Sequence, residues 1–253
     1  GDYYVAVWGH NGAYDPQPYT LRTQVLSPTV PVPVASPIPP TSSPPPLDAT
    51  VRTLILYHEA RFQDRYGVTR TEMVTTHLMT LTQAVDGVLV DLGSYTDAAA
   101  AYAQWDAQPE NPLAANYVTD IVKHSVKGML TQSYPNAEYI VIVGNDNVVP
   151  FRRVPDRTLI ANERAYNAWV KGGSPMAARL RAGALLSDDF YAGLQTPRLG
   201  RAFYLPEIAI GRLVETPEEI VAAINAYLTA PATTFTRALV TGYDFLLDEA
   251  RAI

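Results

Sequence analysis

Histidine, carboxylate and serine side chains in this sequence could carry out acid–base or nucleophilic chemistry. Glu59 follows His58 at the end of an apolar run, and a histidine beside a carboxylate could act as a general base. Adjacent side chains point in different directions, however, so we interpret the pair as the end of a strand and the start of a helix. A hydrolase that pairs Ser94 or Ser187 with His58 is the weaker alternative, because neither serine lies in a Gly-x-Ser-x-Gly context.

A second group of side chains consists of carboxylates and amides, which are the ligands that calcium prefers. The turn Gly144-Asn145-Asp146-Asn147 offers one carboxylate and two amide oxygens, and Asp188 and Asp189 follow later in the chain. Such hard oxygen ligands suit Ca²⁺. Asx side chains also stabilise turns by bonding to their own backbone. We favour the ordinary turn and keep a structural calcium site formed by Asp146, Asp188 and Asp189 as the alternative hypothesis.

Composition excludes several other kinds of chemistry. The 253 residues contain no cysteine, so they can form no disulfide, thiolate metal site or cysteine nucleophile. The net charge is −6 and no Lys/Arg cluster occurs, which argues against binding to nucleic acid or to an anionic membrane. No apolar run approaches the roughly 18 residues of a membrane span.

The remaining histidines and glycines show no pattern of a metal or nucleotide site. His10, His77 and His124 lack a metal-ligand spacing such as His-Glu-x-x-His, and we interpret them as structural. No P-loop pattern occurs, and no Gly-x-Gly-x-x-Gly follows a strand, so a nucleotide would lack its usual phosphate cradle. We therefore expect no required cofactor.

Apolar runs alternate with helical patterns after residue 49, and this order predicts an α/β fold. Strands separated by helices imply right-handed crossovers, a mostly parallel sheet and helices on both of its faces. Thr216, Pro217 and Glu219 predict a helix start with a capping box. Because ligands bind beyond the carboxyl ends of parallel strands, we expect any function at that edge. The expected strands are residues 52–57, 87–92, 139–144, 207–212 and 238–242, and the expected helices are residues 71–84, 113–134, 162–182 and 216–228.

Two segments precede the α/β region. Residues 28–48 read as a semi-rigid linker, because nine of the 21 prolines lie in residues 28–46 and favour extended polyproline II. Residues 1–27 contain two β-type runs around a turn, Tyr3-Tyr4-Val5-Ala6-Val7 and Tyr19-Thr20-Leu21. This pattern resembles the end of a bacterial pre-peptidase C-terminal-type β-sandwich. We therefore expect a β-hairpin remnant of a truncated sandwich, followed by a linker.

Four segments of the α/β region resemble, in the same order, the gingipain-type cysteine peptidases. The first is the strand and turn of residues 139–151, which is similar to Gly-Asp-x-x-x-(Ile/Val)-Pro, and the second is Ser187-Asp188-Asp189-Phe190-Tyr191, which is similar to Ser-Asp-x-x-Tyr. The third is the Gly-Arg strand of residues 206–213, which an acidic helix follows. The fourth, residues 237–244, resembles the strand that opens the second subdomain of that family.

The resemblance implies a caspase-like fold, with residues 49–235 as the first subdomain and residues 236–253 as the start of the second. In the family the catalytic histidine and cysteine lie in the second subdomain. We therefore expect this chain, whose two ends look cut from a longer one, to be the non-catalytic part of a secreted bacterial endopeptidase. Its partners would be a peptide or protein substrate and the remainder of the same polypeptide. Asp244 and Asp248 fall where the family places the acid that binds a basic substrate side chain.

One alternative reading of the whole chain remains. An α/β domain of flavodoxin type, joined by a spacer to a β-sandwich, could be a stand-alone binding or scaffold module without enzymatic activity. That reading predicts a well-formed last helix and a cooperative melt.

Overall fold

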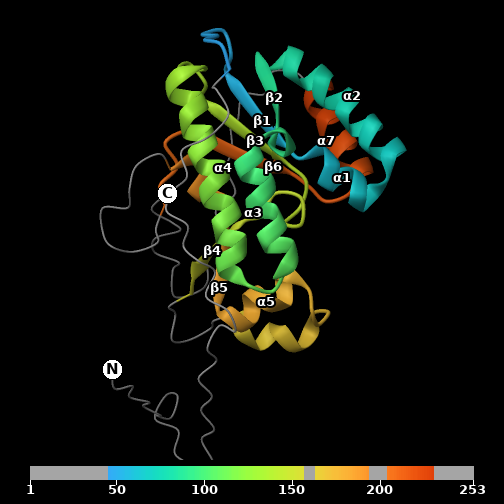
Figure 1. Cartoon of the computed structure of the whole chain (residues 1–253). Helices are drawn as coiled ribbons and strands as arrows, with labels where there is room; N and C mark the ends of the chain where they lie inside the picture. The colour runs from blue at the N-terminus through green and yellow to red at the C-terminus, as the bar shows by residue number, and fades with distance from the viewer. Residues whose placement is uncertain (1–44, 157–162, 194–203, 231–253) are drawn as a thin grey trace, which may run out of the picture. The chain divides into compact units, whose positions relative to one another are not determined.

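Four parallel strands form the sheet on which the described residues are built. The computed structural model describes residues 45–156, 163–193 and 204–230, and the structural statements below concern these ranges. The sheet has the strand order β2-β1-β3-β6, and every neighbouring pair is parallel (Figure 1). Its strands are β1 (Thr53–Tyr57), β2 (Gly87–Asp91), β3 (Tyr139–Val143) and β6 (Ala209–Leu213).

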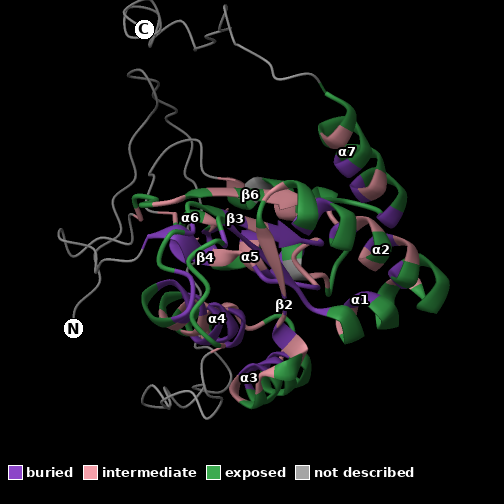
Figure 2. Ribbon diagram, turned by 90° about the horizontal axis from the view of Figure 1, so that it is seen from above, coloured by how far each residue is buried: buried purple, intermediate pink, exposed green. Residues whose placement is uncertain are grey.

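Helices cover both faces of this sheet, as the sequence predicted. From β1 the chain runs outward to β2, and from β2 it returns past β1 to β3, so right-handed crossovers place the two sets of connecting helices on opposite faces. Figures 1 and 2 show α3 and α4 on one side, and α1, α2 and α7 on the other. The bounds are α1 Glu59–Tyr66, α2 Val68–Ala84, α3 Thr96–Ala107, α4 Pro112–Gln132 and α7 Pro217–Thr229.

The core lies between the sheet and these helices because the two central strands are apolar on both faces. Leu54, Ile55 and Leu56 of β1 are fully buried, and Ile140 and Ile142 of β3 are nearly so. Helix α7 begins with the predicted capping box, in which the Thr216 hydroxyl accepts from Glu219 N at 3.2 Å and Glu219 Oε2 accepts from Thr216 N at 3.0 Å. None of the helices in the described ranges has the length and hydropathy of a membrane span.

The prediction of a single helix over residues 162–182 is wrong. The 3-10 helix η3 and the short helix α5 take its place, and residues 170–174 separate them. Gly173 has φ +74, a conformation that glycine adopts without the steric cost that other residues incur, and Ser174 then caps α5 by accepting from Ala177 N at 3.1 Å. The bounds are η3 Glu163–Trp169 and α5 Pro175–Ala182.

A second, two-stranded sheet was not predicted. Strand β4 pairs in antiparallel fashion with β5, and the short helix α6 follows β5. Asp188, which follows β5, thereby lies within hydrogen-bond distance of Arg212 near the carboxyl end of β6. The bounds are β4 Arg152–Pro155, β5 Ala184–Ser187 and α6 Asp189–Ala192, and the 3-10 turn η2 (Leu92–Ser94) follows β2.

The last residues of the Pro-rich segment are anchored at the opposite end of the sheet. Ser133, just after α4, donates its hydroxyl to Pro45 O at 2.6 Å, and Asn136 donates its amide to Ala49 O at 2.9 Å. The predicted hairpin of residues 1–27, most of the linker, and residues 236–253 lie outside the described residues.

Candidate functional site

The carboxyl edge of β1 and β3 is the candidate site. These two strands are neighbours, and the chain leaves them in opposite directions along the sheet, which is the arrangement at which open α/β sheets bind ligands. Helix α1 begins directly after β1. Residues 144–151 follow β3 and form what we call the β3 loop.

The β3 loop turns sharply on Gly144. Its φ is +98, and a Cβ atom at this position would lie 2.9 Å from Cβ of Val148, so only glycine fits without displacement. Asn145 Oδ1 accepts from Asn147 N at 3.1 Å, which is the Asx turn that the sequence analysis favoured. The carbonyl of Asn145 also accepts from Val148 N and Val149 N.

A buried ion pair holds the loop from inside. Asp146 accepts from Arg153 Nη1 at 2.8 Å and from Nη2 at 2.7 Å, and the Arg153 side chain is only 3% exposed. Asp146 Oδ1 also accepts from Phe151 N at 2.9 Å. Bidentate geometry fixes the orientation of both planar groups, so the loop is tied to the start of β4.

A second buried ion pair holds the loop from the side of β6. Arg212 donates to Asp188 through Nε at 2.8 Å and Nη2 at 2.5 Å, and its Nη1 donates to the carbonyls of Gly144 and Val149, each at 2.8 Å. The guanidinium carbon lies 3.8 Å from the centre of the Phe151 ring. Tyr191 adds a short hydrogen bond from its buried hydroxyl to Pro150 O.

The motifs singled out from the sequence therefore meet at one place. We call Asp146, Arg153, Asp188, Tyr191 and Arg212 the loop clamp. Asp146 comes from the β3 turn, Asp188 and Tyr191 from the Ser-Asp-x-x-Tyr segment, and Arg212 from the Gly-Arg strand, while Arg153 comes from β4, outside these motifs. The five side chains bind one another and the loop backbone. Their arrangement is that of a structural device.

The predicted calcium ligands lie close to this clamp, but two of the three have arginine partners. Asp146 pairs with Arg153 and Asp188 with Arg212, while Asp189 is exposed in the first turn of α6. Within the described ranges, no group of three or more His, Cys, Asp or Glu side chains is placed to hold a metal ion. Calcium binding by these carboxylates stays a prediction, which isothermal titration with Ca²⁺ tests.

His58 is buried and caps helix α1. Its Nδ1 accepts from Arg61 N at 3.4 Å, and its ring stands edge-on to that of Tyr102 at 4.6 Å. Burial lowers the pKa of His58 below its ordinary value of 6.5, and the carboxylate of Asp91 partly opposes this shift. His58 therefore lies between the end of β1 and the start of α1, as predicted, and its imidazole caps the helix, which was not predicted.

The serine alternative has no support in this geometry. Ser94 donates its hydroxyl to Asp91 O at 2.7 Å, and the Ser187 hydroxyl accepts from Asp189 N at 3.2 Å. Neither of these two described serines forms a hydrogen bond with His58, which is the contact that a serine nucleophile needs.

An open cleft of about 540 Å³ lies on the outer side of the β3 loop. The cleft was not predicted, because it depends on residues 59–66 forming a helix, α1, and only a helix start was expected there. The signal was present, since Arg61, Asp64 and Arg65 have the i, i+3, i+4 spacing that places side chains on one helix face. The lining residues are Arg61, Asp64, Arg65, Asp106 and Asn147.

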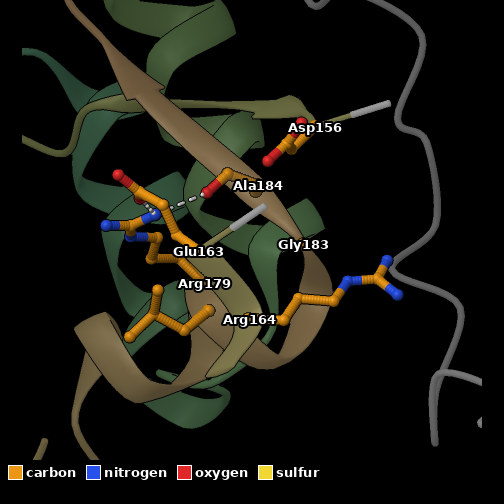
Figure 3. A pocket seen from close by; sticks show the side chains of 7 residues that line it. Asp156, Glu163, Arg164, Arg179, Gly183 and Ala184 are labelled. Atoms are coloured by element: carbon orange, nitrogen blue, oxygen red, sulfur yellow. Dashed lines mark hydrogen bonds and ion pairs between the residues drawn. The ribbon is translucent and has the colours of Figure 1, made fainter. Parts of the chain in front are cut away.

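A smaller depression lies among η3, α5 and β5 (Figure 3), and its own side chains fill it. Arg179 makes a short ion pair with Glu163 and donates to Ala184 O at 3.1 Å, as the dashed lines in Figure 3 show. Arg164 covers Gly183, because a Cβ there would lie 2.4 Å from the Arg164 Nε. This place is a structural junction without room for a ligand.

The two predicted substrate-binding acids, Asp244 and Asp248, lie outside the described residues. Comparison with known families gives one result. The family model described as Peptidase family C25 matches residues 52–241, a range that includes the four-stranded sheet, the loop clamp and the cleft. No curated protein and no solved structure matches the chain significantly.

Proposed function

Because the chain belongs to peptidase family C25, the gingipain family of cysteine peptidases, we propose that its 253 residues are the non-catalytic first part of an endopeptidase. The Cys-His dyad would be supplied by other polypeptide of the same enzyme. Family membership implies protein substrates.

The observation that carries the proposal is the loop clamp. The charged residues through which this chain resembles the family are engaged in buried ion pairs, since Asp146 binds Arg153 of β4 and Asp188 binds Arg212. A carboxylate that is locked in a buried bidentate pair is not available as an acid or base. Such residues support a site and do not act on a substrate.

The amino-acid composition also supports a non-catalytic role for this chain. Peptide cleavage by a cysteine peptidase needs a thiolate that attacks the carbonyl carbon and an imidazole that takes up and returns the proton. The chain has no cysteine, and its buried His58 is engaged as a helix cap. The residues described here would hold the β3 loop in one conformation beside the catalytic part.

We also propose where the enzyme acts: outside the cell or on its surface. The likeness of residues 1–27 to a pre-peptidase C-terminal-type sandwich supports a secreted or cell-surface bacterial enzyme, since such domains accompany secreted bacterial hydrolases. These residues lie outside the described ranges, so this part of the proposal depends on the sequence alone.

The test is an assay of the full polypeptide encoded by the parent reading frame with a library of fluorogenic peptides. We expect cleavage that iodoacetamide abolishes and that chelators leave unchanged. Cleavage that survives iodoacetamide would contradict a thiol mechanism. No cleavage by a folded parent would instead favour the stand-alone binding module.

A further inference from the structure

The cleft beside the β3 loop is used neither by the clamp nor by the proposed catalytic chemistry. We infer that it binds an extended peptide segment through a carboxylate group on that peptide. The choice of a peptide as ligand rests on the proposed function, whereas the preference for a carboxylate rests on the groups that line the cleft.

The cleft has the position and size of a ligand site. Its walls come from α1, which follows β1 directly, from the end of α3, and from the loop that follows β3. It therefore lies at the switch point of the sheet. A volume of about 540 Å³ falls within the roughly 300–1,000 Å³ of ordinary ligand pockets and accommodates a few peptide residues.

Arg61 is a rigid donor in this cleft. Its Nε donates to Asn147 O at 2.9 Å, and its Nη1 lies 2.9 and 2.8 Å from the two carboxylate oxygens of Asp106. The guanidinium group also lies over the rings of Tyr102 and Trp105, at 4.7 and 5.3 Å from their centres. Within the described ranges, Nη2 donates to no protein group, so one fixed N–H pair remains for a ligand.

Within the described ranges, three further side chains of the lining form no hydrogen bond or ion pair with the protein. In the part of the chain that the structure describes, Arg65 contacts the Tyr66 ring at 5.5 Å but pairs with no carboxylate. Within the same described ranges, the Asn147 side-chain amide forms no hydrogen bond, and Asp64 forms no ion pair. The cleft thus presents two guanidinium groups, an amide and the carboxylates of Asp64 and Asp106 to the solvent.

These groups select a singly charged ligand. Guanidinium groups bind carboxylates with short, directional hydrogen bonds, and an asparagine amide can donate to and accept from a peptide group at the same time. Asp64 and Asp106 line the same walls and repel polyanions. A phosphate or nucleotide is therefore disfavoured, while one carboxylate on an otherwise neutral peptide is accommodated.

The experiment measures binding of two capped, fluorescently labelled hexapeptides to the 253-residue chain, one with a central glutamate and one with glutamine in its place. We expect the glutamate peptide to bind about fivefold more tightly, as one partly exposed ion pair provides. Arg65→Gln should reduce this preference, because only Arg61 would remain to bind the carboxylate. The matched control is Arg70→Gln on α2, which also removes one exposed arginine, 58% exposed and paired with Glu218, but away from the cleft; it should leave the preference unchanged.

Equal binding of the two peptides, no binding of either, or equal effects of the two substitutions would overturn the inference. These outcomes are distinct from the peptidase test. If the parent enzyme cleaves peptides but the 253-residue chain binds neither hexapeptide, the inferred role of the cleft is wrong and the proposed function still holds. If the chain binds the glutamate peptide specifically but the parent cleaves no peptide, the cleft binds a carboxylate and the proposed peptidase function is wrong.

Discussion

Arg212 and Asp188 form a buried, bidentate ion pair across the carboxyl edge of the sheet, with nitrogen–oxygen distances of 2.8 and 2.5 Å. The remaining nitrogen of the same guanidinium donates to the carbonyls of Gly144 and Val149. One side chain of β6 therefore joins α6 and both ends of the β3 loop. This side chain thereby connects three segments that are far apart in the sequence.

Replacing Asp188 by asparagine should destabilise the fold strongly. Arg212, whose side chain is 6% exposed, would remain buried without a counter-charge, and breaking such a pair costs about 3 kcal/mol. Urea unfolding followed by circular dichroism measures this loss as a lower midpoint at unchanged slope. The control is Asp189→Asn, which alters the neighbouring exposed carboxylate and should shift the free energy of unfolding by less than about 0.5 kcal/mol. Equal effects of the two substitutions would contradict the clamp.

A methyl group at Gly144 should also destabilise the fold. Alanine there would have to adopt φ +98 and would meet Val148 at 2.9 Å, so we expect a loss of about 1–3 kcal/mol. Gly128 in α4 is the matched control, since nothing lies within 4 Å of its Cβ position. Gly128→Ala should stabilise the helix by about 0.5–1 kcal/mol. Thermal unfolding of both variants gives the comparison, and a stabilising Gly144→Ala would show that the loop relaxes easily.

The pKa of His58 predicts how stability depends on pH. Burial holds this pKa below 6.5 in the folded state, so the unfolded chain takes up a proton that the folded chain excludes. The contribution of His58 to the free energy of unfolding is therefore complete above about pH 6.5 and is lost as the pH falls below that value. His58→Asn keeps a helix cap but has no group that titrates in this range.

The measurement is the difference in free energy of unfolding between the wild type and His58→Asn, followed from about pH 7.5 down to about pH 5. We expect the wild type to lose stability relative to the variant over this interval. His77 and His124 are present in both proteins, so their contributions cancel. A difference that stays constant would show that His58 titrates normally.

The sequence predicted the parts of the fold that depend on local pattern. The apolar runs of β1 and β3 and the capping box at Thr216 and Glu219 are local signals, and the structure confirms them. Helix α3 was missed because its alanine-rich sequence gives little contrast between a buried and an exposed face. Strands β4 and β5 were missed because their pairing joins residues about 30 positions apart, a contact that no local pattern reveals.

The candidate site also depends on contacts between distant residues, which the sequence alone does not reveal. Asp146 and Asp188 were recognised as candidate ligands from their residue type and loop position. Their arginine partners, Arg153 and Arg212, come from strands whose side-chain directions only the folded chain defines. Without visible partners, these acids suggested a calcium site as the alternative to an ordinary turn. The same acids with their partners form a clamp.

The most direct test of the central claim is the rate at which the purified 253-residue chain itself cleaves a fluorogenic peptide library, measured against buffer. If this chain is the scaffold of a cysteine peptidase and holds no nucleophile, the two rates should be indistinguishable at any pH at which the chain is folded. Sustained turnover that co-purifies with the chain and disappears with a Ser94→Ala or His58→Asn substitution would contradict that claim.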